Sequence, residues 1–433
     1  MAFPMLAGTF AMNAYNLTDT WFVSRLGTLS LAAMGFTFPV VMLLVCVAGG
    51  IGTGVTTLVS HAIGRHDHDG AARLMSHGIS LILGVALVMS IGGYLSIGPV
   101  FRALGADAKT LPLVGEYMRT WYLGALFMSL PMVGNGILIS AGDSKSASSL
   151  MVFGAALNVI LDPIMIFGYL GFPAMGIRGA ALATVIARAF STAWLLLLLY
   201  KKHRLLVFRA WGLAEYGASI RRIMGFAVPS ILSMGMMPLS ATVITRILSS
   251  FGNEAVAASG AAGRIEMFAF VVPMALGISL TPFVSQNFGA DRVDRVHEAH
   301  RAATGFALLY GGLIGVAFFL GAPWLARAFS GDPKVAVILA SYIRIICFGY
   351  GMREVHRYCG FFLTGLHRPA SATALNAVRV VVLLIPLSCL GGYLGGVNGV
   401  FWGRLTTDLL GGSIGLLWIS RVSRSLPAAV KAE

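Results

Sequence analysis

The chain has 433 residues, of which 57% are hydrophobic and only 11% are charged. A soluble domain is usually about one quarter charged, so this composition excludes an ordinary soluble protein and indicates a polytopic membrane protein. The net charge is +14. In a membrane protein such an excess faces anionic lipid, and no nucleic-acid partner is needed to explain it.

Twelve apolar stretches are long enough to cross a bilayer as helices. In chain order they are residues 2–24, 31–60, 75–100, 113–140, 147–170, 178–201, 221–250, 256–287, 300–322, 333–364, 371–391 and 396–420. Most Lys and Arg residues of the connecting loops lie on the side that carries both termini. The positive-inside rule therefore predicts that both termini are cytoplasmic.

The two halves of the chain repeat each other. After a shift of 225 positions Pro4 meets Pro229, Gly27 meets Gly252 and Gly52 meets Gly277. Each half holds six spans, so both halves start on the same side of the membrane and the repeat is parallel. We predict an all-α integral membrane protein of twelve transmembrane helices, in two six-helix lobes related by a parallel pseudo-twofold repeat.

The predicted lobes are residues 1–205 and 221–433. A basic cytoplasmic linker, residues 206–220, joins them. Two lobes around a central cleft form an architecture suited to alternating access.

Two acidic residues in the first lobe have no basic neighbour within one turn of their own helices. Asp19 has Tyr15 one turn earlier, and Asp162 has Asn158 at the same spacing. The second half has no equivalent, since Asp19 falls on Ile244 and Asp162 on an apolar position. An architectural residue would be expected in both copies, so the asymmetric pair predicts a site.

The chemistry of such a pair fits ion coupling. A buried carboxyl group takes up a proton readily, and a second carboxylate nearby strengthens this tendency. When ionised, the pair attracts an organic cation or Na⁺, with Asp19, Asp162 and Asn158 as the Na⁺ ligands. Proton and cation then compete for one site, which supports exchange if the two loaded states favour opposite conformers. The alternative is a static hydrogen-bonded pair that holds the lobe together.

Three further acids lie inside predicted spans and have basic neighbours. Asp408 has Arg404 one turn earlier, and we expect these two to pair. Glu266 follows Arg264 and is expected to form a structural ion pair. Glu354 lies in a polar cluster and serves either a substrate or a local ion network; its neighbours are Arg353, His356 and Arg357.

Adaptable apolar side chains are the usual lining of a promiscuous pocket. Our candidates for the substrate cleft are Met12, Met34 and Phe36, together with Glu354. We predict no cofactor and no catalytic residues, because the sequence has no HExxH or GxSxG motif.

Several motifs together resemble the multidrug and toxic compound extrusion (MATE) family of secondary transporters. They are "NLTDTWFVSRLGTLSLAAMG", "VSHAIGR" echoed by "VSQNFGA", "ISAGDSKSA", and "LNVILDPIMIFG" followed by "GIRGAALATVIA". The chain looks most like the bacterial DinF-like branch. That branch has an aspartate in span 1, a tyrosine one turn before it, Asn-x-x-x-Asp in span 5 and a threonine in span 6. These match Asp19, Tyr15, Asn158, Asp162 and Thr184.

The resemblance implies a monomeric multi-pass protein of the bacterial plasma (inner) membrane that is not an enzyme. It implies export of cationic or amphipathic small molecules in exchange for H⁺ or Na⁺. A lipid-linked oligosaccharide flippase of the same superfamily is the alternative. Such a flippase needs a cationic cavity for pyrophosphate, and the basic residues of span 333–364, with Arg246 and Arg379, fit that need.

Overall fold

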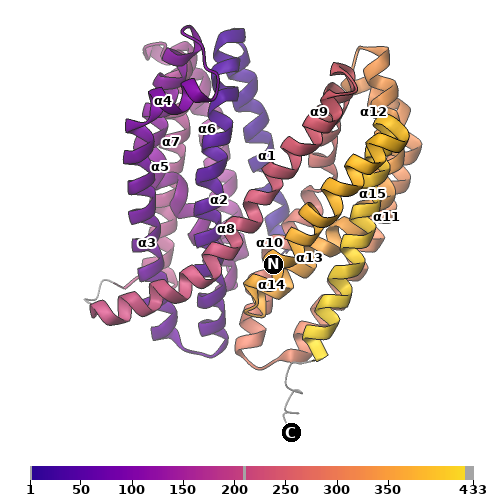
Figure 1. Cartoon of the computed structure of the whole chain (residues 1–433). Coiled ribbons are helices and arrows are strands. Elements are labelled where there is room, and N and C mark those ends of the chain that lie inside the picture. The colour runs from indigo at the N-terminus through magenta and orange to yellow at the C-terminus, as the bar shows by residue number, and fades with distance from the viewer. Residues whose placement is uncertain (1, 208–210, 425–433) are drawn as a thin grey trace. The chain divides into compact units, whose positions relative to one another are not determined.

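The computed structural model describes residues 2–207 and 211–424, and this part of the chain folds into helices with no β-strand (Figure 1). Part of the predicted linker, residues 208–210, lies outside the described residues. The chain divides into two compact units, unit 1 (Met1–Ile231) and unit 2 (Leu232–Glu433).

Unit 1 is a bundle built around close contacts of α1 with α6, α2 with α5, and α7 with both α5 and α6. Its helices are α1 (Ala2–Ser24), α2 (Thr28–Gly64), α3 (His68–Leu95), α4 (Ile97–Ala103), α5 (Thr110–Ser140), α6 (Ser144–Phe167) and α7 (Gly176–Leu197), which continues as a π-helical turn at Leu198–Lys202. Helix α8 (Leu213–Ser249) begins in unit 1 and ends in unit 2.

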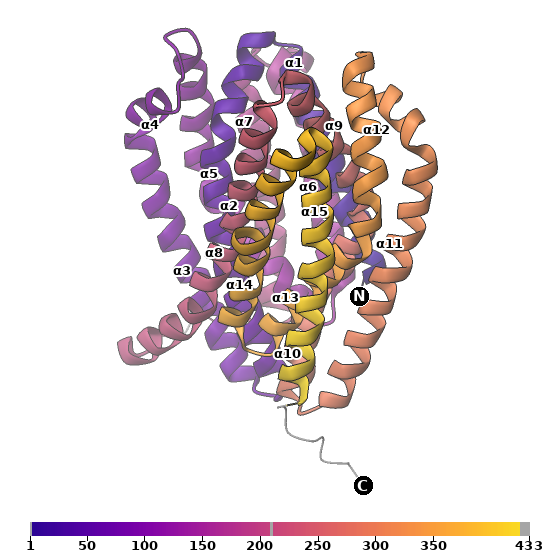
Figure 2. The ribbon, with the colours of Figure 1, turned by 45° about the vertical axis from the view of Figure 1, so that its right-hand side comes forward.

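Unit 2 holds the remaining helices, drawn in rose to yellow in Figures 1 and 2. They are α9 (Asn253–Ala269), α10 (Val271–Gly289), α11 (Val293–Phe329), α12 (Pro333–Ile346), α13 (Tyr350–Gly365), α14 (Pro369–Ala377) and α15 (Ile385–Arg424), with a π-helical segment at Val378–Leu384. Helix α13 packs against α10, α11 and α15, and α12 packs against α9 and α11.

Long apolar helices account for the predicted spans. In the described residues nine helices are long and apolar enough to cross a membrane, or ten if the bent pair α9–α10 counts as one span. The continuous segment Pro369–Arg424 contains two predicted spans, because the backbone leaves helical geometry at Gly395 and Gly396, where φ is 60° at Gly396. Only a residue without Cβ adopts such a φ freely. Helix α1, which carries Asp19, supplies the remaining predicted span.

The sequence repeat is visible in the backbone. Helix α2 corresponds to residues 253–289, the stretch that α9 and α10 fill together. Gly27 and Gly252, which the repeat aligns, precede these helices with φ of 103° and 109°. The matched residues Gly52 and Gly277 both lie at close helix contacts: an added Cβ would come within 2.8 Å of the Met132 carbonyl oxygen and 2.7 Å of the Phe361 ring. The predicted fold class is confirmed.

The two copies differ at one bend. Where α2 is continuous, the second copy breaks at Phe270, and α9 and α10 form an angle of 62°. Pro273 explains the break, because proline has no N–H to donate to the carbonyl of Ala269 and its ring crowds that group. The hydroxyl of Tyr310 donates to the freed Ala269 oxygen at 2.9 Å instead. The bend therefore keeps its backbone satisfied.

Candidate functional site

Unit 1 brings the five predicted coupling residues together where α1, α6 and α7 meet. Asp19 is 5% exposed and Asp162 is fully buried. The two carboxylates interact electrostatically, and Tyr15 interacts with both of them and with the hydroxyl of Thr184. The one-turn spacing places Tyr15 beside Asp19, and Asn158 beside Asp162, on common helix faces. We call these five residues the carboxylate site.

Asn158 links α6 to α7 within this site. In one orientation of its amide, both the NH₂ group and the oxygen have hydrogen-bond partners. The NH₂ group then donates to Asp162 Oδ2 at 3.0 Å, and the amide oxygen accepts from the hydroxyl and the backbone N–H of Thr184, each at 3.2 Å. Because buried amide groups seek partners at both ends, we assign this orientation.

Each carboxylate of the site has one oxygen that accepts no hydrogen bond from the described residues. Oδ1 of Asp19 and Oδ1 of Asp162 are buried and have no hydrogen-bond partner among the described residues. An unpaired ionised oxygen in such a place is unfavourable, whereas a bound proton removes the charge. The geometry therefore suits a group that gains and loses a proton.

Two residues that the sequence did not place in the site lie beside it. The guanidinium of Arg188 on α7 lies 5.7 Å from the ring centre of Tyr15, and its Nη2 lies 3.6 Å from the sulfur of Met12. Tyr117 on α5, 7% exposed, interacts electrostatically with Asp19. A usable signal existed for Arg188, which follows Thr184 by one helical turn.

The candidate cleft residues lie in different surroundings. Met34 and Phe36 are partly buried and pack against the hydrophobic core of unit 1. Met12 contacts Arg188. Glu354 lies in unit 2, is only 1% exposed and pairs with Arg357 on its own helix. Of the two readings for Glu354, these contacts favour the local ion network.

Unit 2 contains a second polar cluster, centred on Glu266. Its carboxylate accepts from Arg404 Nη2 at 3.0 and 2.8 Å, from Arg353 Nη1 at 2.7 Å and from the Tyr342 hydroxyl at 2.7 Å. Glu266 therefore forms a structural ion pair, as predicted. Its partners are Arg353 and Arg404, whereas the neighbouring Arg264 is exposed. Residues two apart on a helix point to different faces, which explains the difference.

The predicted pair of Asp408 with Arg404 is wrong. Asp408 is fully buried and accepts from Arg379 Nη2 at 2.5 Å. Arg379 sits in the π-helical segment, a local widening that is frequent at functional sites. Arg404 turns instead to Glu266, where both carboxylate oxygens accept from one guanidinium, a strong charge-assisted arrangement.

The polar groups of unit 2 form one cluster with a positive surplus. Asp408 interacts electrostatically with Arg353, Arg404 and Glu354. The cluster thus holds four guanidiniums, those of Arg353, Arg357, Arg379 and Arg404, against three carboxylates, those of Glu266, Glu354 and Asp408. We call it the arginine cluster. Among the residues that the structure describes, no group of three or more His, Cys, Asp or Glu side chains fits a metal ion.

The comparisons with known proteins agree with this architecture. The MatE family profile matches residues 4–164 and 229–390, one range in each copy of the repeat. The chain is 36% identical over 412 residues to an FAD transporter of Shewanella oneidensis, covering 95% of this chain and 91% of that one. It is 22% identical over 409 residues to the multidrug export protein MepA of Staphylococcus haemolyticus, covering 94% and 88%.

Solved structures match over nearly the whole chain. The MATE transporter VcmN of Vibrio cholerae in its bent form matches with a TM-score of 0.93 and 28% identity, covering 98% of this chain and 96% of that one. A MOP superfamily transporter from Pyrococcus furiosus, whose binding pocket is described as having reverse polarity, matches with a TM-score of 0.90 and 25% identity. It covers 99% of this chain and 95% of that one.

Proposed function

Because the chain belongs to the MatE family of membrane transporters, we propose that it exports small organic molecules in exchange for protons. Members of this family are transporters and not enzymes. One observation carries the coupling half of the proposal. Asp19 and Asp162 form a buried pair, and the Oδ1 atom of each has no hydrogen-bond partner among the residues that the structure describes.

The pair works as a switch between two charge states. When both carboxylates are ionised they repel each other in a medium with little water, so a proton entering from outside binds readily. Binding removes a negative charge from unit 1 and changes the interactions among α1, α6 and α7. If the protonated and deprotonated states favour opposite-facing conformers, the inward proton gradient drives export.

The orientation of Asn158 supports H⁺ over Na⁺ as the coupling ion. Its amide NH₂ points at Asp162, and its oxygen is taken by Thr184. A metal cation needs oxygen lone pairs and is repelled by N–H donors, whereas a protonated carboxyl group tolerates a neighbouring donor. Na⁺ binding by Asp19, Asp162 and Asn158 would require the amide to rotate. Rotation breaks the hydrogen bond to Asp162, and the NH₂ group then donates to the Thr184 hydroxyl at 3.2 Å.

We propose FAD as the first substrate to test. The relative that shares 36% identity over nearly the whole chain is named an FAD transporter. FAD carries a pyrophosphate, and the surplus guanidinium of the arginine cluster suits an anionic group. Arg353 is the suitable donor, because both oxygens of Glu266 already accept from Arg404 and the Arg353 side chain is partly exposed.

Cationic or amphipathic drugs are the second candidate, supported by the negative charge of the carboxylate site and by the multidrug exporter among the relatives. A lipid-linked oligosaccharide flippase stays as the alternative, since its substrate shares the pyrophosphate group with FAD. We propose that this protein lies in the bacterial inner membrane, with both termini in the cytoplasm. The support is the distribution of Lys and Arg among the loops.

The test is transport into inverted vesicles or proteoliposomes that carry either a proton gradient or a Na⁺ gradient alone. FAD and a cationic dye are measured separately. Wild-type protein is expected to move substrate under the proton gradient, and Asp19→Asn is expected to abolish this. Asp69→Asn is the matched control, because Asp69 is an exposed acid remote in sequence from the site. Transport by Asp19→Asn at the wild-type rate, or transport driven by Na⁺ alone, contradicts the coupling proposal.

A further inference from the structure

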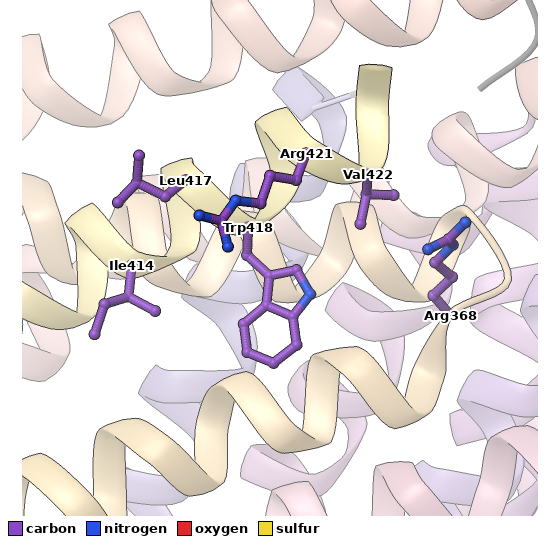
Figure 3. A pocket seen from close by; sticks show the side chains of 6 residues that line it. All are labelled: Arg368, Ile414, Leu417, Trp418, Arg421 and Val422. Carbon is purple, nitrogen blue, oxygen red and sulfur yellow. The ribbon is translucent and has the colours of Figure 1, made fainter. Parts of the chain in front are cut away.

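A cavity of about 330 Å³ opens at the C-terminal end of α15, and none of its lining residues belongs to the carboxylate site or the arginine cluster (Figure 3). Its lining consists of two arginines, a tryptophan and three aliphatic side chains: Arg368, Ile414, Leu417, Trp418, Arg421 and Val422. Five of these residues come from α15, and Arg368 comes from the turn between α13 and α14.

The two arginines of this cavity have no anionic partner in the described part of the chain. Both side chains are exposed, and neither takes part in an ion pair there. The exposed Arg292 of the same unit, by contrast, pairs with Asp294. Two unpaired guanidiniums at one cavity attract an anion with several oxygens, since each guanidinium presents parallel N–H donors.

The rest of the wall is apolar and faces outward. Ile414, Leu417 and Trp418 share one face of α15, because their spacing is three and four residues. Leu417 is 62% exposed, and Trp418 is partly buried against the hydrophobic core of unit 2. In Figure 3 the Trp418 indole extends from α15 toward the neighbouring helix, with the two arginines on either side of it. Tryptophan is enriched where a membrane protein passes from hydrocarbon to headgroups.

The cavity lies at the strongly basic end of unit 2. The same end carries further arginines in the α10–α11 turn, in the first turns of α11 and at the end of α15: Arg292, Arg295, Arg301 and Arg424. In the proposed orientation this end meets the cytoplasmic leaflet, which holds anionic lipid. Basic pockets beside transmembrane helices on that side are suited to lipid headgroups.

We propose that this cavity binds an anionic phospholipid of the cytoplasmic leaflet. The anionic headgroup lies between Arg368 and Arg421, Trp418 lies at the glycerol level, and one acyl chain follows Leu417 and Ile414. The choice of leaflet rests on the proposed orientation. The site is independent of the proposed substrate and coupling ion, so the binding assay below succeeds or fails separately from the transport assay.

The experiment is native mass spectrometry of the purified full chain titrated with phosphatidylglycerol or phosphatidylcholine of the same acyl composition. Wild-type protein is expected to retain phosphatidylglycerol about tenfold more tightly. The double variant Arg368→Gln/Arg421→Gln is expected to lose about that factor, which corresponds to about 1.4 kcal/mol. The charge-matched control Arg301→Gln/Arg424→Gln removes two arginines from the same end of the unit without touching the cavity, and it is expected to keep the preference.

Three results overturn the proposal. They are equal retention of the two lipids by wild-type protein, an equal loss in the test and control variants, and displacement of phosphatidylglycerol by equimolar sn-glycerol 3-phosphate, which would identify a site for soluble anions. Bromine-labelled phosphatidylglycerol provides a second readout that depends on position. The labelled lipid is expected to quench part of the tryptophan fluorescence of the wild-type protein. In Trp418→Phe the part of the quenching that comes from Trp418 is expected to disappear. Unchanged quenching in Trp418→Phe would contradict the placement of the lipid.

Discussion

At the scale of single residues, the proposal that the carboxylate site takes a proton depends on the orientation of Asn158. Its NH₂ group faces Asp162 and its oxygen faces Thr184, so the carboxylate meets a donor on that side. In the proposed mechanism this donor favours a proton over a metal cation. The same amide joins α6 to α7, the helix that carries Thr184 and Arg188.

Replacing that donor is expected to change ion selectivity. Asn158→Asp places a carboxylate oxygen where the NH₂ group lies, and it creates a set of oxygen ligands for Na⁺. We expect Na⁺ to raise the melting temperature of this variant, because a ligand that binds the folded state stabilises it. Wild-type protein in matched K⁺ and Na⁺ buffers serves as the control and is expected to melt at the same temperature in both. A Na⁺-insensitive variant would refute the role given to the amide.

Another single-residue prediction concerns the buried pair of Arg379 and Asp408. Arg379→Gln leaves the fully buried Asp408 without its partner, and we expect a loss of about 3–5 kcal/mol of unfolding free energy. The double variant Arg379→Gln/Asp408→Asn removes both charges and is expected to recover most of this loss. Melting in detergent measures both proteins. Equal destabilisation of the two would show that the pair does not act as a unit.

At the scale of elements, side-chain oxygens bind the backbone where helices begin or bend. Asp143 does so at the start of α6, and Tyr310 does so at the bend between α9 and α10. Asp143 precedes α6 and accepts from the backbone N–H of Ser146, from Lys202 Nζ at 2.6 Å and from His203 at 3.1 Å. It thus fixes the end of the π-helical turn after α7 to the start of α6. Partial burial raises the pKa of Asp143, but the hydrogen bonds from Lys202, Ser146 and His203 outweigh it and hold that pKa well below its usual range.

The sign of the pH dependence follows from this depressed pKa. Stabilisation by ionised Asp143 is fully present above the usual aspartate pKa of about 3.9 and is lost as the pH falls below it. We expect Asp143→Asn to lower the unfolding free energy by about 1 kcal/mol at pH 7, a modest value because Lys202 is half exposed. The difference from wild type should stay constant down to about pH 5 and shrink as the pH falls below about 4, toward the depressed pKa of the folded state. A difference that grows on acidification would contradict the assignment, and Asp69→Asn is the control.

The bend between α9 and α10 gives a second element-scale prediction. Tyr310→Phe removes the hydroxyl that donates to the Ala269 carbonyl, so a buried backbone acceptor loses its partner. We expect a loss of about 1 kcal/mol of unfolding free energy. Tyr393→Phe is the matched control, because Tyr393 is 88% exposed. Equal melting of the two variants would mean that Tyr310 does not support the bend.

At the scale of the whole molecule, the distribution of basic loops predicts the orientation in the membrane. We expect single cysteines at exposed positions Asp69 and Lys109 to react with a membrane-impermeant thiol reagent from opposite sides, position 69 from the cytoplasm. The background must lack the four native cysteines, of which Cys389 is exposed. Labelling of intact cells and of inverted vesicles gives the answer. Reaction of both positions from one side would invalidate the assignment of the loops.

The sequence was sufficient to predict the two-fold repeat of helices and the residues of the carboxylate site, but not the pairing within the arginine cluster. A repeat aligned by Gly27 and Gly252 predicted helices whose bounds correspond in both copies. One-turn spacing predicted the neighbours of Asp19 and Asp162, because such pairs lie on the same helix. The partners of Glu266 and Asp408 were not predictable in this way. They come from other helices, and local spacing says nothing about which guanidinium packing brings closest.

The unequal charge of the two repeats has a consequence for how such a transporter changes over time. Unit 1 holds the unpaired carboxylates, and unit 2 holds the surplus guanidinium, although both halves share one backbone plan. Under the proposed function, cargo preference and ion preference are encoded in separate stretches of the gene. We then expect substitutions in the second half to alter the transported substrate without changing the coupling ion.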